Sequence, residues 1–230
     1  MQDQINGILL VDKPQSKTSH DIVYWARKRF QGIKIGHAGT LDPIATGLLV
    51  LLLGKATKKS QLFTSAEKQY VGQMTLGFQT DTLDTDGKMI AQMPIPQITE
   101  NKVREVFQLF TGPVEQTPPM YSAIHINGKR LYQWAQKGIE VERPKRIIEI
   151  YELKLLHFIE NKIDFFVHCS KGTYIRSLIS DLGEKLNTLS TMSALRRVQS
   201  GDFVVENAIA AFDLKSKSED YLKAKIIPLT

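Results

Sequence analysis

Cysteine is almost absent from this sequence of 230 residues, because Cys169 is the only one. No disulfide can form within the chain, and this usage is typical of proteins in a reducing compartment, so we expect a cytoplasmic protein. Long apolar runs are missing too. The longest, Leu48–Leu53, is far shorter than the roughly 20 residues of a membrane helix, and the short apolar run Ile8–Val11 does not make a signal peptide. We therefore expect no membrane association.

Recognisable metal and cofactor motifs are also lacking. The histidines at positions 20, 37, 125, 157 and 168 are isolated, and the sequence contains neither a Walker loop nor a dinucleotide fingerprint. The acidic segment Thr80–Gly87 invites comparison with a calcium loop. With Gly87 at the sixth position, however, Thr82 and Met93 fall where such a loop needs acidic ligands. We predict no metal and no cofactor, and we interpret the segment as a polar turn whose carboxylates face a cleft.

The composition is that of a globular protein large enough to bury a core without metal or disulfide staples. Hydrophobic residues make up 42% and charged residues 23% of the chain. The net charge of +6 favours a polyanionic partner, although many basic proteins have none.

Hydrophobic periodicity and capping residues predict the main elements. Apolar runs and alternation predict strands at 7–11, 48–53, 68–76, 121–126, 146–156 and 162–169. Helices are expected after Thr18 or Ser19, from about residue 54, after Thr99 and from about Ile175. Asn127-Gly128 is typical of a hairpin turn.

The segment Gly36–Gly47 is the strongest candidate for chemistry. Its glycines and proline indicate irregular backbone, and it leads directly into the apolar run Leu48–Leu53. Asp42 is its only carboxylate, and Pro43 restricts the backbone of Asp42 to extended conformations. Two interpretations remain open on these grounds: Asp42 is an ordinary Asp-Pro turn residue, or it is a catalytic carboxylate on a stiff loop.

Other features are weaker when taken alone. Arg176 falls in the first turn of a predicted helix, where the helix dipole disfavours cations, so it either has a carboxylate or phosphate partner or bends back to solvent. Tyr70 suits half-buried packing. Aromatic residues among the basic residues after Gly128 suit a mobile arm that grips nucleic acid, or simple packing. The residues alone support carboxylate chemistry on an anionic substrate and go no further.

Several segments, in one fixed order, extend this interpretation. They are Asn6–Pro14, His37–Gly47, Lys68–Tyr70, Leu76–Gly77, Thr80–Gly87, Met120–Ala123, Gly128–Tyr132, His168–Arg176, Asp181–Gly183 and Leu195–Arg197. Together they cover nearly the whole chain and resemble the bacterial tRNA pseudouridine-55 synthases of the TruB type. The resemblance implies a mixed α+β pseudouridine synthase fold, with a central, mostly antiparallel sheet, flanking helices and a cleft. It also implies isomerisation of a uridine in the T loop of tRNA.

The same resemblance implies roles for individual residues. Asp42 would be the essential carboxylate, acting either as a nucleophile or as a base that removes a ribose proton. Arg176 would pair with Asp42, and Tyr70 would stack on the uracil and help remove the C5 proton. The remaining residues implied in substrate binding are His37, which would fill the space of a flipped base, Asp84, Tyr174, Leu195 and Lys13.

The resemblance leads us to expect one catalytic domain over residues 1–230, with an RNA-gripping thumb at about 121–146. Longer family members continue into a PUA domain, and we expect none here because the sequence ends at Thr230. We expect a monomer whose partner is the tRNA T arm. An RNA-binding protein that remodels tRNA without catalysis, and a synthase acting on another RNA, are the alternatives. The trio of Asp42, Tyr70 and Arg176 disfavours the first.

Overall fold

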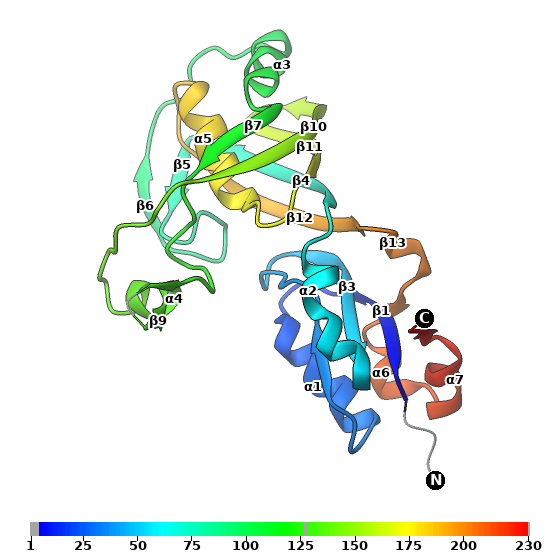
Figure 1. The fold of residues 1–230 in the computed structure, drawn as a ribbon. Coiled ribbons are helices and arrows are strands. Elements are labelled where there is room, and N and C mark those ends of the chain that lie inside the picture. The colour runs from blue at the N-terminus through cyan, green and yellow to red at the C-terminus, as the bar shows by residue number, and fades with distance from the viewer. Residues whose placement is uncertain (1–4, 127, 230) are drawn as a thin grey trace. The chain divides into compact units, whose positions relative to one another are not determined.

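The computed structural model describes residues 5–126 and 128–229, which form two compact units. Unit 1 comprises the described residues before Gly72 and after Ala194, and unit 2 is Gly72–Ala194. Strands β4 (Lys68–Leu76) and β12 (Ser190–Ser200) carry the chain from one unit to the other (Figure 1). The expectations of one catalytic domain, of a thumb at 121–146 and of no PUA domain stay predictions.

Unit 1 is built on an antiparallel pair of buried strands. Its elements are β1 (Gly7–Lys13), α1 (Ser19–Arg29), β2 (Ile35–His37), β3 (Thr46–Leu53), η1 (Gly54–Lys59), α2 (Ser60–Thr64), β13 (Phe203–Val204), η2 (Val205–Asn207), β14 (Ile209–Ala210), α6 (Asp213–Ser216), α7 (Glu219–Ala224) and β15 (Ile227–Pro228). Strands β1 and β3 pair from Gly7 opposite Leu53 to Lys13 opposite Gly47. Nearly every residue of these two strands is buried, so both of their faces are covered. This burial is expected for strands that read as continuous apolar runs.

Helix α1 begins where its capping residues predict. Thr18 is the N-cap, and its side chain and that of Asp21 form a reciprocal capping box. Asp21 and Thr18 therefore fix the first turn, and Ile22, Ala26 and Phe30 are buried along one side of the helix and its C-cap.

Unit 2 contains a five-strand portion of sheet in the order β12-β4-β11-β10-β7 (Figure 1). Its further elements are β5 (Phe78–Thr80), β6 (Met89–Gln92), α3 (Glu100–Leu109), β7 (Gly112–Gln116), β8 (His125–Ile126), β9 (Lys129–Arg130), α4 (Leu131–Ala135), β10 (Arg146–Ile159), β11 (Lys162–Cys169) and α5 (Ile175–Lys185). The long pair β10–β11 confirms the predicted hairpin, and Cys169 at its end is buried.

The expected α+β class with a mixed, mostly antiparallel sheet is confirmed. Strands β1 and β14, and strands β3 and β12, pair in parallel, whereas β1–β3, β2–β3, β10–β11 and β7–β10 are antiparallel. The predicted strand at 121–126 was too long, because only β8 forms there. Asn127 of the predicted turn lies outside the described residues, while β8 and β9 pair across it. In the part of the chain that the structure describes, no helix is long and apolar enough to cross a membrane.

Candidate functional site

The Asp42 loop connects β2 to β3 in unit 1 and places a half-buried carboxylate between buried neighbours. Leu41 and Ile44 on either side of Asp42 and Pro43 are 4% and 3% exposed. The amide of Ala45 donates to the Asp42 carbonyl at 3.0 Å, which closes a tight turn. The loop is therefore packed into the unit on both sides of the aspartate.

Two buried side chains from the start of the chain hold the backbone beside Asp42. The Ser19 hydroxyl accepts from the Leu41 amide at 2.8 Å and donates to the Leu41 carbonyl at 3.1 Å. Lys13 is fully buried, and its Nζ donates to the carbonyls of Pro14 (2.9 Å), Lys17 (2.6 Å) and Pro43 (3.3 Å). Lys13 thus holds the Asp42 loop, and its expected contact with substrate stays a prediction.

A third buried residue, Arg197 on β12, fixes both ends of the loop. Its Nε donates to the Leu48 carbonyl at 2.7 Å, and its Nη2 donates to the Gly39 carbonyl at 3.1 Å. Gly47 lies opposite Arg197 in the parallel β3–β12 ladder. Charged donors make stronger hydrogen bonds than neutral ones, so this arginine stabilises the conformation of the loop. Ser19 and Arg197 were not predicted as site residues.

His37, at the end of β2, lies near one end of this loop. Burial lowers the pKa of its imidazole, and the nearby charges of Arg197 and His20 lower it further. The imidazole is therefore neutral near pH 7. A neutral, half-buried ring suits contact with nucleobases better than it suits an ion pair with phosphate.

Tyr70 and Leu195 are the other predicted residues in unit 1. Tyr70, on β4, is 9% exposed, and Leu195, on β12, is 7% exposed. The Leu195 carbonyl accepts from the Thr46 hydroxyl at 3.4 Å, which links β12 to the start of β3. The part of β12 that carries Leu195 therefore adjoins the end of the Asp42 loop.

Arg176 is the central charge of unit 2. It lies in the first turn of α5, is 5% exposed, and its Nε is 3.7 Å from the Asp84 carboxylate. Its Nη1 and Nη2 donate to the carbonyls of Thr82 and Tyr121 at 2.8 and 2.9 Å. The interpretation that Arg176 has a carboxylate partner, rather than bending back to solvent, is thus confirmed for Asp84. Its pairing with Asp42, which belongs to unit 1, stays a prediction.

Asp84 itself is embedded in the polar turn predicted at 80–87. Its carboxylate accepts from the Thr82 hydroxyl at 2.6 Å and from the Asp86 amide at 3.2 Å. Its backbone bridges to Met192 of β12. These bonds fix a buried carboxylate beside Arg176, and its predicted contact with the base stays a prediction.

Tyr174 precedes α5 as its N-cap residue and is held by a side chain from β7. The Gln116 amide donates to the Tyr174 carbonyl at 3.0 Å and accepts from the Tyr174 amide at 2.8 Å. The Arg146 guanidinium lies over the Tyr174 ring, 4.7 Å from its centroid. Neither Gln116 nor Arg146 was predicted as a site residue.

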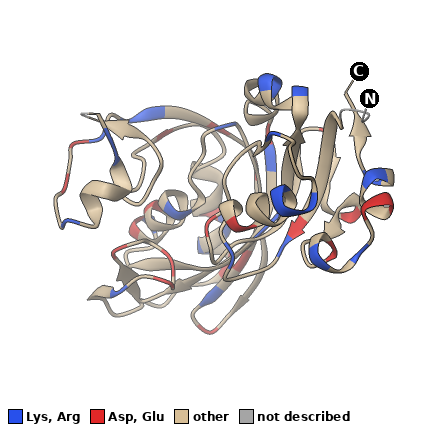
Figure 2. Cartoon of the chain, turned by 90° about the horizontal axis from the view of Figure 1, so that it is seen from below, with Lys and Arg blue, Asp and Glu red and all other residues tan. Residues whose placement is uncertain are grey.

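The two units differ in charge. With the terminal residues included, the sequence of unit 1 (residues 1–71 and 195–230) carries 16 Lys and Arg residues against 10 Asp and Glu residues, whereas unit 2 carries 14 of each. Figure 2 shows both signs spread over the elements of the chain. The whole net charge of +6 therefore belongs to unit 1, which also carries Asp42.

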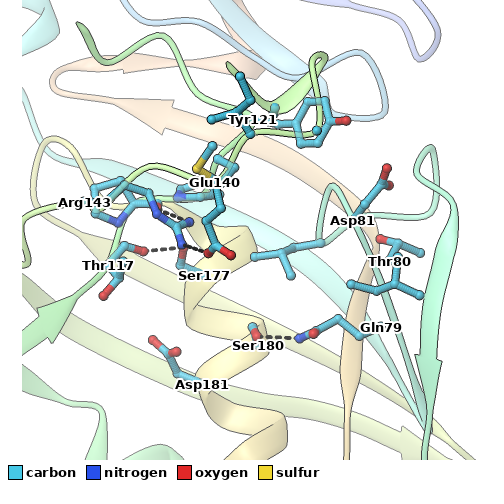
Figure 3. Close-up of a pocket in the computed structure, with 18 of the residues that line it drawn as sticks. Gln79, Thr80, Asp81, Thr117, Tyr121, Glu140, Arg143, Ser177, Ser180 and Asp181 are labelled. Atoms are coloured by element: carbon cyan, nitrogen blue, oxygen red, sulfur yellow. Dashed lines mark hydrogen bonds and ion pairs between the residues drawn. The ribbon is translucent and has the colours of Figure 1, made fainter. Parts of the chain in front are cut away.

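A cavity of about 570 Å³ opens in unit 2 beside α5 (Figure 3). Asp81, Glu140 and Asp181 line it, and Arg143 crosses it to bind the Glu140 carboxylate at 2.8 Å and the Pro118 carbonyl at 3.1 Å. The described residues include no group of three His, Cys, Asp or Glu arranged to hold a metal ion.

Asp181 is the most perturbed acid in this cavity. Burial raises the pKa of its carboxyl to about 6, and the neighbouring Glu184 carboxylate raises it as well, while Lys145 opposes the shift. Because the folded pKa exceeds the ordinary value of 3.8, the folded state binds this proton more tightly than the unfolded state does. The resulting stabilisation is complete below about pH 4 and is lost as the pH rises through 6.

Replacing Asp181 with asparagine should therefore stabilise the protein at neutral pH. We expect a gain of about 1 kcal/mol in the free energy of unfolding at pH 7.5, discounted for the partial exposure of this side chain, and no gain at pH 4. Urea unfolding at both pH values measures this. The exposed Asp202→Asn is the matched control, and an equal gain for Asp181→Asn at both pH values would contradict the raised pKa.

Two family models match residues 27–230, one directly after the other. The model described as TruB family pseudouridylate synthase, N-terminal domain, matches residues 27–175. The model described as tRNA pseudouridylate synthase B, C-terminal domain, matches residues 176–230.

Curated relatives are similar over nearly the whole chain. The tRNA pseudouridine synthase B of Opitutus terrae is 42% identical over 226 residues, which cover 98% of this chain and 94% of the relative. The tRNA pseudouridine synthase B of Caldicellulosiruptor saccharolyticus is 45% identical over 225 residues, which cover 98% of this chain and 75% of the relative.

Solved structures share the fold. A chain in the crystal structure of a Cbf5-Nop10-Gar1 complex superposes with a TM-score of 0.73 and 31% identity. The match covers 96% of this chain and 60% of that one, so this chain spans less than two thirds of its length.

Proposed function

Because the chain belongs to the TruB family of pseudouridylate synthases, we propose that it isomerises uridine 55 in the T loop of tRNA to pseudouridine. Formation of pseudouridine in tRNA follows from that membership. The position in the T loop, the use of Asp42 and the flipping of the base are our proposal. The observation that carries it is the Asp42 loop, which has the family's motif and is anchored by three buried side chains.

A fixed carboxylate is what the reaction requires. The bond from the ribose to nitrogen 1 breaks, the uracil rotates, and a bond forms from the ribose to carbon 5. Carbon 5 loses a proton and nitrogen 1 gains one, so the product is an isomer of the substrate and no co-reactant is needed. Asp42 acts either by attacking the ribose or base, or by removing a ribose proton so that a glycal forms. In both cases an anchored loop lowers the cost of orienting the carboxylate. Ser19, Lys13 and Arg197 supply that anchorage through backbone atoms.

The other residues surround this step in our proposal. Arg176 pairs with Asp42 and keeps it charged, and Tyr70 stacks on the uracil and helps to remove the C5 proton. Tyr174 and Leu195 line the pocket, and Asp84 contacts the base. The ion pair of Asp84 with Arg176 supports a further role for Asp84, which is to hold the guanidinium in place.

RNA binding and base flipping fit the charge and the chemistry of unit 1. A nucleotide stacked in the T loop is out of reach of a carboxylate, so it must leave the stack. His37, neutral near pH 7, fills the space it leaves. The excess of Lys and Arg in unit 1 binds phosphates, so affinity falls with salt. We propose that the protein acts in the cytoplasm as a monomer.

Tritium release from RNA labelled with 5-tritiated uridine tests the proposal, because the C5 hydrogen leaves only when the base rejoins through carbon. We expect release of one tritium per T-arm RNA, and none when cytidine replaces nucleotide 55. Release from both RNAs would contradict modification at nucleotide 55. RNA binding without release from either would favour the alternative of a tRNA-remodelling protein.

A further inference from the structure

The segment predicted as the thumb lies within unit 2 and is connected to its sheet through two adjacent strands, β7 and β10. Gln116 is the last residue of β7, Arg146 is the first residue of β10, and the two are cross-strand partners. The two ends of the intervening chain therefore meet at one point of the sheet. Gln116 and Arg146 are therefore the residues through which both ends of this chain join the sheet.

Both members of the pair hold the same residue. Gln116 is 1% exposed and brackets the backbone of Tyr174 with its two hydrogen bonds. Arg146 covers the ring of Tyr174 and donates through Nη2 to the Gly172 carbonyl, two residues earlier. The backbone and the ring of Tyr174 are thus held by the two residues, Gln116 and Arg146, at which the thumb segment joins the sheet.

Further hydrogen bonds join the chain that follows Gln116 to helix α5. The Ser177 hydroxyl donates to the Thr117 carbonyl at 2.8 Å, and Arg176 donates to the Tyr121 carbonyl at 2.9 Å. Tyr174, as the N-cap residue, has no side-chain cap, and the Gln116 side chain accepts from its amide instead. The start of α5 is therefore built on the chain that leads into the thumb.

We propose that Gln116 and Arg146 are positioning residues for Tyr174, which transmit the placement of the thumb on RNA to the substrate pocket. The inference rests on the proposed function, in which Tyr174 lines that pocket. In this proposal Arg146 affects turnover by positioning the Tyr174 ring, and not by binding a phosphate of the RNA directly.

A double-mutant cycle tests this role. We expect Arg146→Met to lower kcat on T-arm RNA about tenfold with KM within about twofold, since the ring is misplaced while RNA binding remains. In a Tyr174→Leu background the same change should cost less than about twofold, because the ring it acts through is gone. Lys154→Met, an exposed cation on the same strand, is the matched control and should leave both constants unchanged.

Arg146→Lys separates charge from planar stacking. A lysine cannot lie flat on the ring and bond Gly172 as the guanidinium does, so most of the loss in kcat should remain. Urea midpoints for every variant establish that each is folded.

Two results would overturn the inference while the proposed function stands: additive losses in Arg146→Met and Tyr174→Leu, or a salt slope of binding that falls by about one in Arg146→Met, as for a lost phosphate contact. Failure of the wild-type protein to form pseudouridine would instead overturn the proposed function, and this inference with it.

Discussion

Replacing Asp42 with asparagine is expected to abolish pseudouridine formation and to leave RNA binding in place. We expect tritium release to fall on the order of 10³-fold or more, because an amide at this position is neither an anionic nucleophile nor a base near pH 7. The loop should survive the change. The hydrogen bonds that fix Leu41 and Pro43 come from the side chains of Ser19 and Lys13, and asparagine has the size of aspartate.

The measurement compares release and T-arm RNA affinity in the two proteins. Asp21→Asn is the matched control, since it removes one carboxylate from the same unit, while the amide oxygen of asparagine can still accept from the Thr18 amide in the capping box. This control should keep wild-type turnover. Equal release by Asp42→Asn and the wild type would mean that Asp42 is the turn residue of the simpler interpretation.

The elements that were predicted correctly have local causes. Helices α1 and α3 begin after Thr18 and Thr99, whose side chains cap them, and the strand Lys68–Leu76 has its predicted bounds because buried and less buried residues alternate along it. Such signals depend on neighbours within a few residues in the chain, and a sequence displays them directly.

Strand β12 was not predicted because most of its buried residues are polar. Ser190, Thr191, Arg197 and Ser200 are each at most 3% exposed, so no apolar alternation marks the strand. The predicted strand at 121–126 failed for a related reason. The carbonyls of Ser122 and Ile124 accept from the amides of Tyr132 and Leu131, at the start of α4, so this segment bonds to a helix start where a strand was expected.

In the candidate site, too, the residues with local signals were predicted and those that act through distant contacts were not. The residue types and order of the Asp42 loop were enough to single out the aspartate, but its anchors come from β1, α1 and β12. Ser19 is 22 residues from Leu41, and Arg197 is 158 from Gly39. Nothing in a single sequence marks such pairs, because each residue by itself resembles an ordinary helix cap or a basic surface residue. The same holds for Gln116 and Tyr174 in unit 2, which are 58 residues apart.

The second large effect is expected at Gly47, where the Asp42 loop enters β3. Gly47 has φ +96°, which side-chain-bearing residues rarely adopt. A Cβ at this position would lie 2.3 Å from the carbonyl oxygen and 2.8 Å from the amide nitrogen of Arg197. Gly47→Ala must therefore separate β3 from β12 and loosen Arg197, and we expect a loss of about 3 kcal/mol or more in the free energy of unfolding.

Urea unfolding and turnover measure the two consequences of Gly47→Ala. Gly32→Ala is the matched control, because Gly32 also has a positive φ, +76°, but nothing lies within 4 Å of the added Cβ. The control carries only the backbone strain, about 1 kcal/mol, and should keep its turnover. Gly47→Ala should lose turnover as well as stability, since Arg197 also holds Gly39 at the other end of the loop. Equal losses of stability in the two variants would show that backbone strain alone, and not the close approach of β12, requires glycine at position 47.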